Sequence, residues 1–181
     1  MVEATAFAVL VLVLAAAAAW DIRRQIVPNH VAYPAIVLGL VGWTAVGAWQ
    51  GRALELGGAS LVAALAAFIP MLFLFTAGGF GGGDVKLMTA VGALSASWQC
   101  VLATAVYSLL VGAAMAVVVM IRRRIVWRTL KRIGTAAMIA FARVKPDMPT
   151  DSPRIPFAAA VAVGGTLAGV EHLLHVRMPW G

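Results

Sequence analysis

Two aspartates stand at the edges of apolar runs, where an ionisable side chain is costly to keep. Asp21 directly follows the apolar run at residues 4–20, and Asp84 ends the glycine-rich stretch GGFGGGD. The other two aspartates lie in a polar, proline-containing stretch, at Asp147 and Asp151. A charge costs about 2.5–3.5 kcal/mol at the bilayer centre and less toward the interface, so such groups usually mark function.

Two carboxylates that come close together share a proton and titrate as a unit. One can then act as a general base on water while the other acts as a general acid. Structural roles are the alternative. Asp21 could cap a helix end or pair with Arg23 or Arg24, and Asp84 could cap the following helix or pair with Lys86.

The glycines favour the catalytic interpretation of Asp84. A helix cap needs one suitable residue, whereas the run before Asp84 holds five glycines. Glycine lets the backbone take unusual dihedral angles and lets another chain approach closely. Irregular backbone at membrane depth is tolerated where it is buried or lines a wet cavity. The run therefore predicts a water-accessible cleft in which an extended peptide lies beside Asp84.

The composition indicates an integral membrane protein. The 181 residues are 62% hydrophobic and 12% charged, whereas a soluble domain is nearer half apolar and a quarter charged. The basic residues, which give a net charge of +7, lie between apolar runs. We therefore interpret them as topology signals and lipid contacts and expect no nucleic-acid partner. The single cysteine, Cys100, cannot build a zinc site, and we expect no metal and no cofactor.

The apolar runs predict an all-α fold with about six membrane spans in one domain covering residues 1–181. Each span needs about 20 residues, so the long apolar stretch after Asp84 must break, most readily at SASWQ, residues 95–99. Residues 50–58 are expected to form a short loop. The spans are predicted at residues 4–20, 31–49, 59–76, 85–97, 99–121 and 155–174.

The lysines and arginines predict the orientation of these spans. With the N-terminus outside, 12 of them fall on the inside and 2 on the outside. Cytoplasmic loops carry the excess of positive charge, so both termini are predicted outside and both Asp21 and Asp84 at the cytoplasmic edge. Residues 122–145 alternate cationic and apolar faces, which predicts an amphipathic helix on the membrane surface whose Arg122–Arg132 segment meets anionic headgroups.

Several motifs resemble one enzyme family. Gly81, Gly82, Gly83 and Asp84 fit the G-x-G-D pattern of intramembrane aspartyl peptidases, and GGGDVKL looks like its form in the type IV prepilin peptidases. DIRRQIVPN resembles the first-aspartate segment of those enzymes, in which an apolar residue and the pair Pro28-Asn29 form a turn. RIPFAAAVAVGG resembles their final helix. The resemblance covers almost the whole chain.

The resemblance implies a catalytic pair made of Asp21 and Asp84. It implies cleavage of prepilins or pseudopilins at the cytoplasmic face of a bacterial inner membrane, after a glycine that ends a basic leader and ahead of an apolar helix. Gly81, Gly82 and Gly83 would shape the loop, and Pro28 and Asn29 the turn after Asp21. Lys86 would tune the pair or contact lipid phosphate.

The chain also departs from the larger members of that family. Those enzymes carry a cytoplasmic insertion with two C-x-x-C pairs that bind zinc, and they methylate the new N-terminus. Here about ten residues separate the first two spans and four cysteines are absent, so methyl transfer is in doubt. The compact form looks like the peptidases of tight-adherence (Flp) pilus systems. The oligomeric state does not follow from these motifs.

Two other functions compete with proteolysis. A small transporter could use Asp21 and Asp84 to relay protons or bind a cation. Transporters more often show an internal repeat and acidic groups near the midplane, neither of which is evident here. A non-catalytic subunit of a secretion machine is the third possibility, although the presence of both aspartates argues against it.

Overall fold

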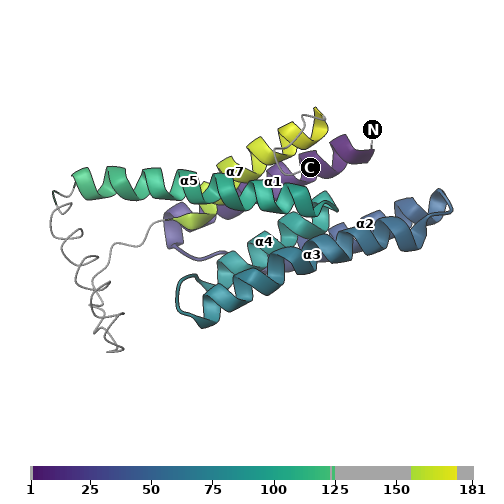
Figure 1. The fold of residues 1–181 in the computed structure, drawn as a ribbon, viewed down its shortest axis with the longest axis horizontal. Coiled ribbons are helices and arrows are strands. Elements are labelled where there is room, and N and C mark those ends of the chain that lie inside the picture. The colour runs from purple at the N-terminus through teal and green to yellow at the C-terminus, as the bar shows by residue number, and fades with distance from the viewer. Residues whose placement is uncertain (1, 123, 125–155, 175–181) are drawn as a thin grey trace. The chain divides into compact units, whose positions relative to one another are not determined.

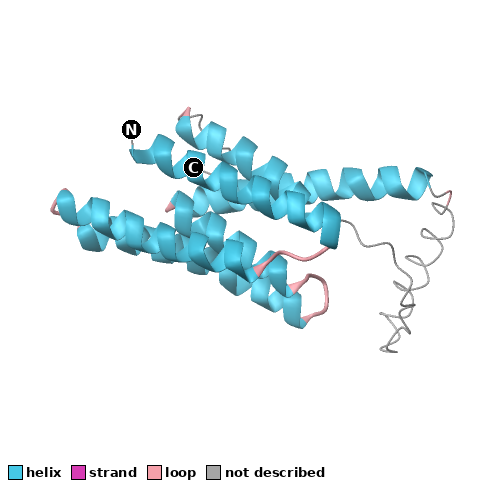
Figure 2. Cartoon of the chain, turned by 180° about the vertical axis from the view of Figure 1, so that it is seen from behind, coloured by secondary structure: helices cyan, strands magenta, loops and turns pink. Residues whose placement is uncertain are grey.

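A computed structural model describes residues 2–122, 124 and 156–174. Within these ranges the chain forms helices joined by short loops, and no strand (Figures 1 and 2). The helices are α1 (Val2–Arg24), α2 (Asn29–Trp49), α3 (Ala53–Thr76), α4 (Gly82–Ser95), α5 (Trp98–Arg122) and α7 (Phe157–Leu173). The all-α prediction is therefore confirmed for the described residues.

The chain divides into two compact units. The first contains Met1–Val111 and Pro156–Gly181, and the second contains Gly112–Ile155. The first unit holds α1 to α4, the beginning of α5, and α7, and the contacts discussed below lie within it. The single domain over residues 1–181 stays a prediction. The predicted amphipathic segment at residues 122–145 falls almost entirely outside the described residues.

Among the described residues, four helices are long and apolar enough to cross a membrane: α1, α2, α3 and α5. α7 is apolar but shorter. Large apolar side chains such as Leu12, Val37, Phe73 and Leu110 are more than half exposed, as expected of surfaces that face lipid. α4 has 14 residues and rises about 21 Å, less than the roughly 30 Å of bilayer hydrocarbon.

The helices extend beyond the predicted apolar runs. α1 continues to Arg24, beyond the end of the span predicted at residue 20, so Asp21 lies near the C-terminal end of a helix. α3 begins at Ala53, because the residues after it include good helix formers and because Glu55 in the first turn pairs with Arg52. The predicted break at residues 95–99 is confirmed, since α4 ends at Ser95 and α5 begins at Trp98.

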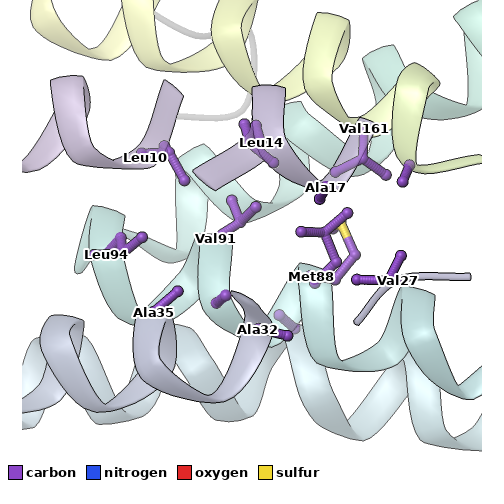
Figure 3. Packing of buried hydrophobic residues seen from close by; sticks show 14 of the residues in the cluster. Leu10, Leu14, Ala17, Val27, Ala32, Ala35, Met88, Val91, Leu94 and Val161 are labelled. Carbon is purple, nitrogen blue, oxygen red and sulfur yellow. The ribbon is translucent and has the colours of Figure 1, made fainter. Parts of the chain in front are cut away.

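α4 packs against four other helices of the first unit. Its larger contacts are with α3 and α2, and it also touches α1 and α7, while α1 packs along α7. Figure 3 shows Val91 of α4 facing Leu14 of α1, and Met88 of α4 facing Ala17 of α1, across this core. Small residues permit the close approach, since a Cβ on Gly92 would overlap the main chain of α3 at Ala63.

Side chains from α2 and α3 bind the C-terminal end of α4. The last carbonyls of a helix have no partner within that helix. Ser60 Oγ on α3 donates to the Ala93 carbonyl over 2.7 Å, and Trp43 Nε1 on α2 donates to the Leu94 carbonyl over 2.9 Å. These bonds fix the position of α4 along its neighbours, and therefore also the position of its first turn.

α7 is held by α5 as well as by α1. The Tyr107 hydroxyl on α5 lies 2.8 Å from both carboxylate oxygens of Glu171 on α7. A Cβ on Gly164 would lie 2.6 Å from the main-chain nitrogen of Ser108, so the two backbones nearly touch. α7 therefore has a defined register, which places its N-terminus at the end of α1.

Candidate active site

Asp21 is buried where α1 ends. Its side chain is 7% exposed. One carboxylate oxygen, Oδ2, accepts a hydrogen bond of 2.9 Å from the main-chain N–H of Ala158, in the first turn of α7. A carboxylate among the otherwise apolar residues that α1 buries, Leu10, Leu14 and Ala17, is unusual, because burying a charge is costly unless it is compensated.

Asp84 is half-buried in the first turn of α4. Its Oδ2 accepts a hydrogen bond of 3.1 Å from the main-chain N–H of Gly81, the residue that precedes the helix. This is the capping geometry considered from the sequence, and a negative charge suits a helix N-terminus. Burial nevertheless raises the pKa of Asp84 to about 6, more than the Gly81 N–H lowers it, and the nearby charge of Asp21 raises it further.

The two carboxylates are therefore brought to one end of the same packed unit. α1 ends beside the point where α4 begins, and the negative charge of Asp21 acts on Asp84. Neither aspartate forms an ion pair with another described residue. The ion pair found among the described residues joins Arg52 and Glu55. The predicted pairings with Arg23, Arg24 and Lys86 are thus not seen.

Lys86 instead links α4 to α2. Its Nζ donates to Asn29 Oδ1 over 2.8 Å and lies 5.0 Å from the centre of the Tyr33 ring. Pro28 precedes α2 in an extended conformation, so the turn after Asp21 presents Asn29 at the start of the helix. The bond holds the turn against α4, close to both aspartates in sequence.

The glycine run works through close approach more than through unusual dihedral angles. Gly78 has a positive φ of +79°, but Gly81 is extended and Gly82 and Gly83 begin α4. A Cβ on Gly83 would lie 3.1 Å from the Val27 Cβ, and one on Gly81 would lie 3.3 Å from Asp84 Oδ2. Because glycine has no Cβ, the turn after α1 can approach the first turn of α4 closely.

The sequence interpretation missed the contribution of α7. α7 contributes the Ala158 N–H that binds Asp21. It also contributes the Phe157 ring, which packs edge-on against Phe80 of the glycine run with ring centroids 4.8 Å apart. The first turn of α7 thus touches the surroundings of both aspartates. Pro156 marks the start of this helix in the sequence, but a main-chain donor carries no signal in the residue types.

A cavity of about 350 Å³ lies at the other end of the unit. It is lined by Glu3 of α1, the residues between α4 and α5, and His172 of α7. Glu3 precedes Asp21 by 18 residues on one helix, which corresponds to about 27 Å. The cavity is therefore separate from the aspartates. The water-accessible cleft beside Asp84 stays a prediction. Within the described ranges no cluster of three potential metal ligands occurs.

The arrangement can perform acid–base chemistry on a water molecule. Two carboxylates with different surroundings, one of them with a pKa near neutrality, can hold one proton between them. The ionised group can then activate water while the protonated group polarises a carbonyl. The same pair could relay protons, so the geometry alone leaves both chemistries open.

Comparison with known proteins decides between these chemistries at the level of the family. No similar curated protein and no similar solved structure was found. The model of the type IV leader peptidase family matches residues 8–117, which include both aspartates and the glycine run but not α7. Membership of this family implies a multi-pass bacterial membrane protein with aspartic endopeptidase activity that removes prepilin leader peptides. Because the match covers more than half of the chain, the protein belongs to the type IV leader peptidase family.

Proposed function

We propose that the protein is a compact prepilin peptidase of the tight-adherence (Flp) pilus type, in which Asp21 and Asp84 are the catalytic pair. The observation that carries the proposal is the meeting of a buried carboxylate at the end of α1 with a second carboxylate at the start of α4. The family match includes both residues. A short turn joins α1 and α2, so no zinc domain lies between them and methyl transfer is not part of the proposal.

The proposed reaction is a direct hydrolysis. The ionised aspartate takes a proton from water, and the resulting hydroxide attacks the carbonyl carbon of the scissile peptide bond. The protonated aspartate donates a hydrogen bond and then its proton to the carbonyl oxygen. As the tetrahedral intermediate collapses, one of its hydroxyl groups returns a proton to the pair, the C–N bond breaks, and the other aspartate passes its proton to the leaving amine, so the pair again holds one proton. No covalent acyl-enzyme forms.

The proposed topology has six apolar segments and both termini in the periplasm. It places Asp21 and Asp84 at the cytoplasmic ends of their segments, where a basic leader arrives from the cytoplasm. The apolar helix of the prepilin or pseudopilin would pack laterally against the small-residue helices in the bilayer. Anionic headgroups would bind the basic segment from Arg122 to Arg132.

The test is cleavage of a prepilin co-reconstituted in lipid vesicles with the wild type, Asp21→Asn or Asp84→Asn. We expect each variant to lose about a hundredfold or more of the cleavage rate, because each lacks one partner of the proton transfer. Asp147→Asn is the control, because Asp147 lies in the polar, proline-containing stretch and not at the edge of an apolar run. This variant should cleave the prepilin at the wild-type rate.

Folding is controlled by a thermal melt of each variant in the same detergent. If Asp21→Asn or Asp84→Asn folds and still cleaves at near the wild-type rate, the catalytic pair is refuted. The proton-relay function would then be the better explanation of the two carboxylates.

A further inference from the structure

A groove between α1 and α2 opens beside the cavity at the end of the unit that lies away from the aspartates. Its volume is about 210 Å³. One face of α1, from Val2 to Val9, and one face of α2, from Leu38 to Val46, line it over about 10–12 Å of each helix. Leu94 of α4 lines it as well. Because α1 and α2 both pack on α4, that helix closes the inner side of the groove.

The groove and the cavity of about 350 Å³ join into one space. Ala6, Trp43 and Leu94 line both of them. The Trp43 ring is held at this junction by the hydrogen bond of 2.9 Å from its Nε1 to the Leu94 carbonyl. Figure 3 shows Leu94 of α4 and Leu10 of α1, which lines the cavity, at the same end of the core. A long molecule can therefore occupy both parts at once.

The two parts of this space differ in chemistry. The groove is lined by aliphatic side chains, glycines and the Trp43 ring, with Thr5 as its one hydroxyl side chain. The cavity brings together a carboxylate, an imidazole, an amide and two hydroxyl groups, which belong to Glu3, His172, Gln99, Ser95 and Ser97. The joined space is apolar in one part and polar in the other, which suits an amphiphile.

The apolar part opens toward the lipid-facing surface. Val2 and Leu38, which line the groove, are 40% and 60% exposed, and Val37 and Val41 beside Leu38 are also more than half exposed. A contiguous exposed apolar surface of this kind faces a membrane or a partner. An apolar space that offers water too few polar partners takes up apolar molecules instead. The groove therefore fits one acyl chain that enters sideways from the bilayer.

The polar part lies where headgroups meet hydrocarbon. Glu3 is in the first turn of α1 and Trp98 begins α5, so the cavity lies at the ends of two long apolar helices. Tryptophan is enriched at this depth of a membrane. A lipid whose chain fills the groove therefore places its headgroup in the cavity.

The charge of the cavity selects the headgroup. Glu3 forms no ion pair with any residue that the structure describes, and the described residues that line the cavity include no lysine or arginine. A negative charge of this kind attracts an ammonium group and repels an anionic headgroup. A primary ammonium donates three hydrogen bonds. The side-chain NH₂ of Gln99, whose oxygen accepts from Ser97 Oγ over 3.0 Å, can donate to a phosphate.

We propose that the groove and the cavity together bind one phospholipid whose headgroup carries a primary amine, with an acyl chain between α1 and α2 and the ammonium group beside Glu3. Phosphatidylethanolamine has this chemistry. A whole helix is about 10 Å across and would have to force α1 and α2 apart, although both pack on α4. The site is separate from Asp21 and Asp84, so the inference does not depend on the proposed function.

The first experiment fills the groove. A Cβ on Gly42 meets nothing within 4 Å, so the side chain of Gly42→Leu can enter the groove. Gly58→Leu is the matched control, because a Cβ on Gly58 of α3 also meets nothing within 4 Å and Gly58 lines neither the groove nor the cavity. Native mass spectrometry of each protein in detergent then counts the molecules retained of dioleoyl phosphatidylethanolamine, phosphatidylglycerol or phosphatidylcholine.

We expect the wild type to retain one phosphatidylethanolamine, with an affinity about fivefold above that for phosphatidylglycerol because of the charge of Glu3. Phosphatidylcholine, whose ammonium group has no N–H, should also bind more weakly. Gly42→Leu should weaken binding about tenfold, because it displaces about two methylene groups of the chain. Gly58→Leu should bind like the wild type, and Glu3→Gln should bind phosphatidylethanolamine and phosphatidylglycerol equally.

Three outcomes would overturn the inference. Equal binding by Gly42→Leu and Gly58→Leu would mean that the retained lipid is annular and that the groove is not its site. A wild type that binds phosphatidylglycerol or phosphatidylcholine as tightly as phosphatidylethanolamine would exclude recognition of a primary amine. A dimer that Gly42→Leu dissociates would show that a second copy of the chain fills the groove.

A second measurement does not need Gly42→Leu to fold. A ligand that binds the native state raises the melting temperature by mass action. Glu3 is exposed at the start of α1, so Glu3→Gln leaves the packed core unchanged. In detergent micelles that contain one lipid, phosphatidylethanolamine should raise the Tm of the wild type more than phosphatidylglycerol does, and Glu3→Gln should lose this difference. A difference of equal size in the two proteins would show that Glu3 does not recognise the headgroup and would overturn the inference.

Discussion

An aspartate carboxylate accepts a main-chain N–H at the start of both α4 and α7, but the two carboxylates come from different places in the chain. At α4 the carboxylate belongs to the same helix, because Asp84 accepts the N–H of Gly81, three residues earlier. At α7 the carboxylate belongs to another helix, because the Ala158 N–H binds Asp21 at the end of α1. A contact within one turn forms with the helix, whereas a contact between distant helices requires the whole unit to pack. The comparison suggests that one half of the site is local and the other half depends on tertiary structure.

The largest difference should appear in the pH dependence of stability. Burial raises the pKa of Asp84 from its ordinary value of 3.8 to about 6 in the native state. Between these values the native state binds more protons than the unfolded state, so stability falls as pH rises through this window. The shift corresponds to about 3 kcal/mol, an upper figure for a half-buried group.

Thermal melts in detergent at several pH values test this prediction. The wild type should melt higher at about pH 4 than at about pH 7, and Asp84→Asn should lose most of that difference. If Asp84→Asn keeps the wild-type dependence, another group titrates in this window and the contrast between the two aspartates is wrong.

A smaller difference is expected when each carboxylate is removed. Asp21→Ala leaves the buried Ala158 N–H without an acceptor, which costs about 1–3 kcal/mol. Asp84→Ala exposes the Gly81 N–H to solvent and costs about 0.5–1 kcal/mol as a lost cap. Unfolding of both variants at about pH 5, where Asp84 is largely protonated, should therefore rank Asp21→Ala as the less stable. The reverse order would mean that the α7 bond is unimportant for stability.

The same contrast explains what the sequence could predict. The apolar runs and the break after Ser95 predicted most of the helices, and the glycine run pointed to Asp84, because hydrophobic pattern and glycine content are local signals. The contact between α7 and Asp21 joins a main-chain N–H to a residue far away in the chain. Only packing decides which helix end meets which carboxylate, so no pattern of residue types could show it.

The glycine run offers a test within the local half of the site. Gly83→Ala would place its Cβ 3.1 Å from the Val27 Cβ, so the turn after α1 must shift by a few tenths of an ångström. We expect a several-fold loss of cleavage rate and a stability change of about 1 kcal/mol or less, as for modest overpacking. Gly79→Ala is the control, because its Cβ would lie 3.4 Å from the Leu74 carbonyl, an ordinary contact. Equal effects of the two changes would show that close approach at Gly83 is unimportant.

The smallest effect is expected at the bond between Lys86 and Asn29, which joins α4 to α2 as the Ala158 bond joins α7 to α1. The bond is 2.8 Å long but lies at an exposed position, so solvent screens it. Lys86→Met and Asn29→Ala should each cost about 0.5 kcal/mol, and the double variant little more than either alone, because both remove the same bond. Additive costs in the double-mutant cycle would show that each side chain acts independently. The α7 bond would then be the one long-range hydrogen bond, among the described residues, that stabilises this end of the unit.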